Sequence, residues 1–155
     1  KHILVSLDGD QIIERAHVNI GMAVALEDGL IVPVIKDADK MSLGEISEAA
    51  RDLAERARTN KLSMDEYKGS TFSISNLGMF GVETFNPIIN QPDAGILGVC
   101  AVQDELVMDD AGAITKRQFM RISFTFDHRL IDGATAAKFE LAIRDLMEHP
   151  MQTLL

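Results

Sequence analysis

The chain has 155 residues, of which 46% are hydrophobic and 25% are charged, which is typical of a single globular domain with a real core. Its 15 basic and 24 acidic side chains give a net charge of −9, which argues against nucleic acid or an anionic membrane surface as the main partner. The single cysteine, Cys100, excludes an internal disulfide framework, and its apolar surroundings predict a buried, inert thiol. No apolar run approaches the roughly 20 residues that a membrane span needs.

Short strands and tight turns are expected in the first 35 residues. Pro33 cannot donate a ladder hydrogen bond, so it restricts its strand to a sheet edge or a bulge. Acidic and glycine residues mark two hairpin turns, at 8–10 and 27–29. The predicted extended segments are residues 2–7, 11–14, 17–26 and 30–35.

The clearest helix follows these strands. Ser42 and Glu45 have the spacing of a capping box. Apolar residues then recur at helical intervals, while charged residues occupy the opposite face. This pattern predicts a helix that covers one side of a sheet. The apolar positions are 43, 46, 49, 50, 53, 54 and 57.

The second half predicts a hairpin of long strands and a closing helix. Residues 70–77 alternate as a strand, with the hydroxyls of Thr71, Ser73 and Ser75 on one face. A long irregular stretch follows, and such stretches are often functional. The order of elements favours an α/β fold with a mixed, largely antiparallel sheet covered by helices. The expected elements are the loop at 77–93, the strands at 94–108 and 113–126, and the helix at 134–148.

One histidine stands where a strand gives way to a helix. His128 follows the strand that ends at Phe126, and Asp132 precedes the helix. Many α/β enzymes hold catalytic groups at such junctions. An imidazole with a pKa of roughly 6.5 can accept and return a proton near neutral pH. The other histidines, at positions 2, 17 and 149, are expected to be structural or solvated.

Spacing alone leaves the role of Asp132 open. An aspartate directly before Gly133 is a favoured helix N-cap, and that interpretation is preferred to an orienting role toward His128. His128 and Asp132 supply only two ligands, so no metal site is expected. The chain lacks both the serine nucleophile elbow and the phosphate-binding P-loop motif.

The segment "DHRLIDGATAAKF" (127–139) resembles the D-H-R-x-x-D-G signature of the dihydrolipoyl acyltransferases, the E2 components of the 2-oxo acid dehydrogenase complexes. Other blocks resemble the same family in the same order, so the similarity runs through essentially the whole chain. The resemblance implies a chloramphenicol-acetyltransferase-like fold. The further blocks are "VNIGMAVALEDGLIVPVIKDAD" (18–39), "GSTFSISNLGMFGVETFNPIIN" (69–90), "PDAGILGV" (92–99) and "LMEHPMQTLL" (146–155).

The resemblance also implies a reaction, which is acyl transfer between a dihydrolipoyl thiol and coenzyme A. The family's general base matches His128, and its motif aspartate, which helps to hold the active-site loop, matches Asp132. The hydroxyl that stabilises the tetrahedral oxyanion matches Ser75. From strand periodicity alone, the preferred interpretation is that Ser75 shares with Thr71 and Ser73 a polar sheet face in water. No residue is assigned to coenzyme A, and no metal is implied.

The family assembles as homotrimers that join into larger cores, with the active site between neighbouring subunits. By this resemblance the chain (1–155) is expected to be the C-terminal part of a catalytic domain truncated at its N-terminus, without lipoyl and peripheral subunit-binding domains. The implied partners are a lipoyl domain, the E1 and E3 enzymes, and other trimers through Met151, Leu154 and Leu155. An apolar tail folded back on its own domain is equally compatible with these residues. A bacterial cytoplasm is favoured over the mitochondrial matrix.

Three functions remain in view. Acetyl transfer is favoured, because "SNLGMFGVETF" (75–85) looks more like pyruvate-type members than succinyl- or branched-chain-type ones. A chloramphenicol-acetyltransferase-like enzyme would share the fold and the H-x-x-x-D spacing while acetylating a small hydroxyl compound. An inactive structural fragment of the core is the third possibility, since the N-terminal part of the catalytic domain is expected to be absent.

Overall fold

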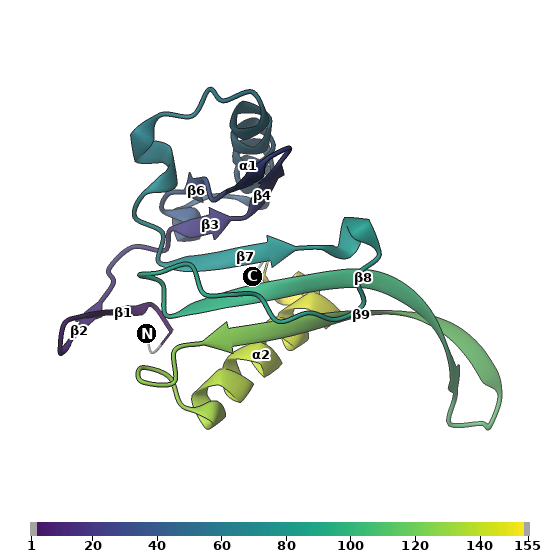
Figure 1. The fold of residues 1–155 in the computed structure, drawn as a ribbon. Helices are drawn as coiled ribbons and strands as arrows, with labels where there is room; N and C mark the ends of the chain where they lie inside the picture. Colours follow the sequence, from purple (N-terminus) through teal and green to yellow (C-terminus); the bar gives the residue numbers. More distant parts are fainter. Residues whose placement is uncertain (1–2, 154–155) are drawn as a thin grey trace.

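A mixed five-stranded sheet in the order β6-β3-β7-β8-β9 organises the protein, whose computed structural model describes residues 3–153 (Figure 1). The three inner strands run parallel to one another, and each edge strand pairs antiparallel with its inner neighbour. This arrangement confirms the predicted α/β class and its mixed sheet. The strands are β3 (Ile20–Met22), β6 (Val34–Ile35), β7 (Phe72–Asn76), β8 (Gly95–Met108) and β9 (Ile114–Phe126).

Two small hairpins flank the sheet, and both predicted turns are confirmed. β1 (Val5–Asp8) pairs with β2 (Gln11–Glu14) through a turn in which Gly9 has a φ of 58°. β4 (Val24–Leu26) pairs with β5 (Gly29–Ile31). The extended segment expected at 17–26 is interrupted after β3. The Ala23 N–H donates to the carbonyl of Ile74, and β4 then turns away to its own partner.

Proline divides the strand expected at 30–35. Pro33 separates β5 from β6, and its carbonyl accepts a hydrogen bond from the Met22 N–H at 2.8 Å. β6 is the outer edge of the five-stranded sheet. This is the edge position predicted from the missing proline donor.

The first helix, α1 (Leu43–Arg58), begins at the predicted cap. Ser42 accepts from the Glu45 N–H, and the Glu45 side chain accepts in return from the Ser42 N–H. Leu53 and Ala57 are buried where α1 packs on β4 and β6, whereas Leu43 at its start is exposed. The helix therefore covers the β4–β6 side of the protein, as Figure 1 shows.

The second helix, α2 (Gly133–Glu148), lies across one face of β7, β8 and β9 (Figure 1). The ring of Phe139 lies 5.5 Å from that of Phe72 and 5.1 Å from that of Phe124, centre to centre. Leu146, near the C-terminal end of α2, is 44% exposed. Four 3-10 helices complete the described elements: η1 (Ala38–Lys40), η2 (Met64–Tyr67), η3 (Gly78–Phe80) and η4 (Pro150–Thr153).

The opposite face of the sheet is covered by the predicted long loop. We call residues 82–93 of this loop the strap. The carbonyl of Val82 accepts from the Ala101 N–H at 2.8 Å, and the carbonyl of Phe85 accepts from the Ser123 hydroxyl at 2.7 Å. Ser73 on this face is 1% exposed. The interpretation of this face as a polar surface in water is therefore wrong for Ser73 and its buried neighbour Thr71.

Residues from distant parts of the chain share one core cluster. Val5, Ala94, Ile131 and Ala136 are buried together, and the partly buried ring of Phe124 packs against them. The far ends of β8 and β9 extend beyond the rest of the sheet as a two-stranded ribbon (Figure 1). Cys100, predicted to be buried, is 3% exposed.

Candidate functional site

The motif turn between β9 and α2 is fixed at both of its ends. The Asp127 N–H donates to the carbonyl of Ala94, and the Asp127 carbonyl accepts from the N–H groups of Leu130 and Ile131. Ile131 is 2% exposed and anchors the turn in the core cluster. His128 lies in the middle of this turn and is exposed. The predicted position of His128 at a strand-to-helix junction is confirmed.

An ion pair brackets His128. Both carboxylate oxygens of Asp127 accept from the Arg129 guanidinium, at 2.6–3.1 Å, and one also accepts from the Arg129 N–H. These bonds to the Arg129 side chain hold the pKa of Asp127 below its usual range. The Asp127 side chain is 18% exposed and that of Arg129 is 64% exposed, so the carboxylate is the more buried partner of the ion pair. It limits the turn's freedom and leaves the His128 ring outside the pair.

The His128 ring lies against Phe126, with ring centres 5.6 Å apart. Phe126 in turn contacts Phe124 on the face that α2 covers. One side of the imidazole is therefore supported by an aromatic ring, while the residue remains exposed. This geometry suits a base that must meet a substrate arriving from solvent or from a neighbouring molecule.

Asp132 caps α2. One of its oxygens accepts from the Thr135 N–H at 2.9 Å, and the other accepts from the Thr135 hydroxyl at 2.9 Å. These bonds, the backbone one first, lower the pKa of Asp132. The cap predicted from sequence is thus confirmed. Among the described residues no hydrogen bond joins Asp132 to His128, so any orienting effect on His128 would act through the position of the turn.

Ser75 lies on the strap side of β7. It pairs in register with Gly98 of β8, which pairs with Ser123 of β9. A side chain added at Gly98 would point toward Phe85 and Pro87 of the strap. Ser75 is half-buried on this face, in line with Ser73, as the alternation predicts.

One copy of the chain does not bring Ser75 and His128 together. Ser75 faces the strap, whereas His128 contacts Phe126 on the α2 side. The register places Ser75 level with Gly98, while the turn that carries His128 begins beyond the Gly95 end of β8. With about 3.3 Å per residue and about 4.8 Å between strands, the two residues are more than roughly 12 Å apart.

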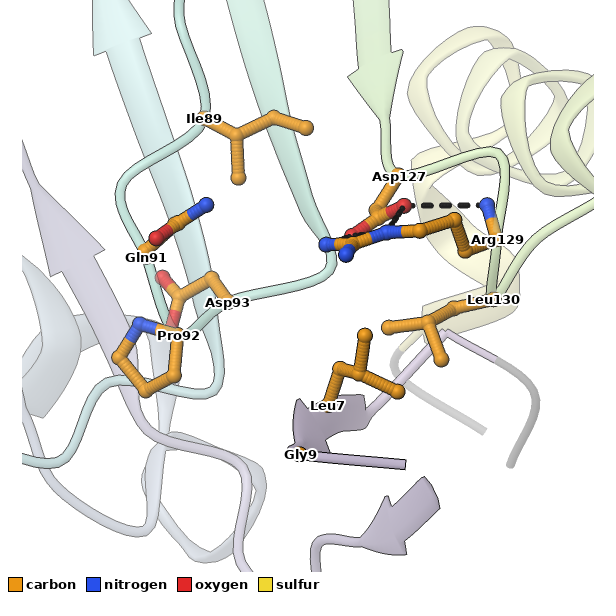
Figure 2. Close-up of a pocket in the computed structure, with 9 residues that line it drawn as sticks. All are labelled: Leu7, Gly9, Ile89, Gln91, Pro92, Asp93, Asp127, Arg129 and Leu130. Carbon is orange, nitrogen blue, oxygen red and sulfur yellow. Dashed lines mark hydrogen bonds and ion pairs between the residues drawn. The ribbon is translucent and has the colours of Figure 1, made fainter. Parts of the chain in front are cut away.

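A pocket of about 320 Å³ opens beside the motif turn. Figure 2 shows Asp127 and Arg129 on one side and Gln91, Pro92 and Asp93 on the other, with Leu7 below. His128 does not belong to its lining. The pocket therefore adjoins the turn without containing its imidazole.

Sequence reasoning missed Asp93. Its side chain is buried, and burial raises its pKa although the hydroxyls of Ser73 and Ser70 donate to it. A sequence signal was available, because "PDAGILGV" (92–99) places a carboxylate directly before an apolar strand. A charge at the entry to a buried strand needs a partner inside the protein.

The remaining histidines have local roles where they are described. His17 binds the Asp37 carboxylate at 2.6 Å, and the Nδ1 of His149 lies 3.2 Å from the carbonyl of Asp145 at the end of α2. Met151 is 70% exposed. The predictions for His2, Leu154 and Leu155 fall outside the described residues. Within residues 3–153, no cluster of metal-ligating side chains occurs, and no helix has the length and hydrophobicity for a membrane span.

Comparison with known proteins gives one consistent family. The family described as 2-oxoacid dehydrogenases acyltransferase (catalytic domain) matches residues 2–155. The acetyltransferase component of the acetoin cleaving system of Bacillus subtilis is 47% identical over 94% of this chain and 36% of its own length. The succinyltransferase component of the 2-oxoglutarate dehydrogenase complex of Rickettsia typhi is 44% identical, over 99% of this chain and 38% of its own length. The chain thus spans well under half the length of these relatives.

Solved structures agree with the sequence comparison. The dihydrolipoamide acetyltransferase of Azotobacter vinelandii superposes with a TM-score of 0.92 at 40% identity, over 99% of this chain and 64% of its own. The cubic core of a pyruvate dehydrogenase multienzyme complex gives the same values. The family match covers nearly every residue, and both structures share the fold, so the expected chloramphenicol-acetyltransferase-like arrangement holds. The chain belongs to the 2-oxoacid dehydrogenase acyltransferase family, within its catalytic domain.

Proposed function

We propose that the protein to which this chain belongs transfers an acyl group between a dihydrolipoyl thiol and coenzyme A. The observation that carries the proposal is the exposed imidazole of His128, held on a turn that Asp127 and Ile131 fix to the core. A thiol with a pKa near 8.5 is mostly protonated at neutral pH, so a neighbouring base increases the supply of the nucleophile.

The chemistry needs one proton acceptor and one hydrogen-bond donor. His128 takes the proton of the attacking thiol, and the sulfur then forms a bond to the thioester carbonyl carbon. Ser75 donates its hydroxyl hydrogen bond to the oxyanion that develops. The oxyanion collapses, the original carbon–sulfur bond breaks, and the leaving thiolate takes the proton back from His128. The loss of one such oxyanion donor typically costs about 3–4 kcal/mol of barrier.

Two copies of the chain complete this site. The strand register separates His128 from Ser75 by more than roughly 12 Å in one copy, so a single tetrahedral centre cannot contact both. A homotrimer in which the His128 turn of one subunit approaches the Ser75 face of the next satisfies the geometry. The likeness to a cubic core supports further assembly of such trimers into a larger particle.

Asp132 holds the site indirectly. A crystallographic and enzymatic study of the Azotobacter acetyltransferase concerns the roles of a serine, a histidine and an asparagine, the last two being four positions apart. His128 and Asp132 have the same separation. Asparagine and aspartate are both good helix caps, so a shared task of fixing the helix start accounts for either residue.

Acetyl is the acyl group that we propose. The relatives include an acetyltransferase at 47% identity and a succinyltransferase at 44%, so the choice is a narrow one that the sequence of residues 75–85 favours. Coenzyme A and a lipoyl group carried on a separate domain are the substrates. The E1 and E3 enzymes of the complex are the partners, and a bacterial cytoplasm is the proposed location.

The test compares His128→Ala with a matched control in the complete protein. Initial rates of acetyl transfer from acetyl-coenzyme A to free dihydrolipoamide are expected to fall at least a hundredfold in His128→Ala. His17→Ala removes another exposed histidine and leaves the rate within twofold. Sedimentation shows whether each variant keeps the assembly of the parent protein.

The outcomes separate the possibilities. Undiminished turnover in His128→Ala would remove the base assignment. A faster wild-type rate with succinyl-coenzyme A than with acetyl-coenzyme A would replace the acetyl proposal by a succinyl one. An assembled wild-type protein without turnover on either donor would show a structural role.

A further inference from the structure

A buried carboxylate lies outside the chemistry described above. Asp93 is 4% exposed and lies two residues before the start of β8. One of its oxygens accepts from the Ser70 hydroxyl at 2.9 Å, and the other accepts from the Ser73 hydroxyl at 2.6 Å. Burial of an unpaired carboxylate is strongly unfavourable, and these two donors compensate it in part. The two serines therefore have a defined task, which is to satisfy Asp93.

The Asp93 network joins the strap to β7. Asp93 and Asn90 belong to the strap, whereas Ser73 belongs to β7. The Asn90 amide donates to the Ser73 hydroxyl at 3.3 Å, and the Asp93 N–H donates to the Asn90 carbonyl at 3.0 Å. The C-terminal end of the strap is thus tied to the strand at a point two residues from Ser75.

The other end of the strap is tied to β8 and β9. The Val82 carbonyl accepts from the Ala101 N–H, and the Phe85 carbonyl accepts from the Ser123 hydroxyl. The ring of Phe85 and the side chain of Pro87 lie directly over Gly98. Gly98 is the residue that pairs with Ser75, so the strap covers the sheet face directly beside Ser75.

We infer that Asp93 is a positioning residue for Ser75. By holding Ser73 and the strap together, it fixes both the strand that carries the Ser75 hydroxyl and the part of the strap beside that strand. This inference rests on the proposed acyl transfer for its kinetic consequence. A displacement of about 1 Å at a reacting group can cost on the order of a hundredfold in rate, so a remote tie of this kind is able to control turnover.

Among residues 3–153, few charged side chains lie near Asp93. Arg15 favours its ionised form, and Asp127 with its partner Arg129 lies across the pocket shown in Figure 2. Because Asp127 and Arg129 are paired with each other, they offer Asp93 little net charge. The two serine hydroxyls are therefore its main support.

The test is a double-mutant cycle in the complete protein. Asp93→Ala is expected to lower kcat at least tenfold while KM for coenzyme A stays within twofold. In the Ser75→Ala background the same change should lower kcat less than threefold, because the hydroxyl through which Asp93 affects the reaction is already absent. Asp93→Asn keeps a hydrogen-bonding group and should retain at least a third of the wild-type kcat. Asp104→Ala, an exposed carboxylate on the β8–β9 ribbon, is the control and leaves kcat within twofold.

A second measurement does not depend on activity. Amide hydrogen exchange across residues 72–76 is expected to accelerate at least tenfold in Asp93→Ala and to stay at the wild-type rate in Asp104→Ala. If Asp93→Ala does not fold, Ser73→Ala removes the same bond from the other side, and both measurements are made with it.

Each result decides one question. An equal loss of kcat in both backgrounds, a loss in Asp93→Asn as deep as in Asp93→Ala, or unchanged exchange in β7 would each overturn the inference. A wild-type protein without acyl transfer would overturn the proposed function instead, and the exchange measurement would still judge the role of Asp93.

Discussion

A single methyl group added at Gly98 should disturb the candidate site. A Cβ atom there would lie 2.4 Å from the Ser123 hydroxyl and 3.1 Å from both Phe85 and Pro87. Rotation of Ser123 relieves the closest contact but breaks its hydrogen bond to the Phe85 carbonyl, at a cost of about 0.5–1.5 kcal/mol. Overpacking against the two rings adds about 1–3 kcal/mol.

Alanine also has a compensating effect. It loses less backbone entropy on folding than glycine, which returns about 0.5–1 kcal/mol. We therefore expect Gly98→Ala to lower the free energy of unfolding by about 1–3 kcal/mol. The protein has one tyrosine and no tryptophan, so urea unfolding is best followed by far-ultraviolet circular dichroism at fixed protein concentration.

Two further variants serve as controls for the Gly98 prediction. Gly44→Ala in α1 places its Cβ no closer than 3.9 Å to the Ser42 hydroxyl, so it should stabilise the protein by about 0.5–1 kcal/mol. Ser123→Ala in the Gly98→Ala background removes the clashing oxygen and should recover part of the loss. An unchanged urea midpoint in Gly98→Ala, or an equal loss in Gly44→Ala, would refute the packing argument.

Three further variants test the turn, the cap and one ion pair. Ile131→Ala should lower the free energy of unfolding by about 2–5 kcal/mol, because the side chain fills the core beneath the motif turn. Ile131→Val should lower it by about 0.5–1.5 kcal/mol, and equal losses in urea unfolding would contradict this. Asp132→Ala should lower the thermal midpoint by about 2–4 °C, while Asp132→Asn, which can still cap α2, should change it little. The bonds from Arg56 lower the pKa of Glu66 from 4.5 to about 2. A carboxyl group with a lowered pKa stabilises the fold above pH 4.5, and this effect is lost as the pH falls toward 2. Glu66→Gln should therefore destabilise the protein at neutral pH and progressively less in acid. A difference in stability between Glu66→Gln and wild type that does not change with pH would argue against the Arg56–Glu66 ion pair.

Local signals in the sequence predicted most of the elements. The capping box at Ser42, the turns at Gly9 and Gly29 and the edge position of the strand at Pro33 all depend on neighbouring residues, and the structure contains each of them. The end of β3 at Ala23 was not predictable in this way. It depends on a hydrogen bond to Ile74, about fifty residues away in the chain, which no local pattern contains.

In the candidate site, too, some features could be predicted from local sequence and others depend on tertiary contacts. The position of His128 and the cap at Asp132 follow from short-range sequence patterns, and their motif also identifies the family. The burial of Ser73 was missed, because alternation shows which side chains share a face but not what covers that face. The cover is the strap, whose attachment through Asp93 is a tertiary contact. The separation of Ser75 from His128 likewise required the strand register.

The shared core cluster has a consequence for biosynthesis. Its members come from β1, from the residue before β8, from the motif turn and from α2, so they are made at widely separated times. Until the ribosome has translated Ala94, Val5 has none of these partners. The growing polypeptide must therefore keep its early hydrophobic residues soluble until α2 emerges, and nascent forms that stop short of α2 are expected to depend on chaperones.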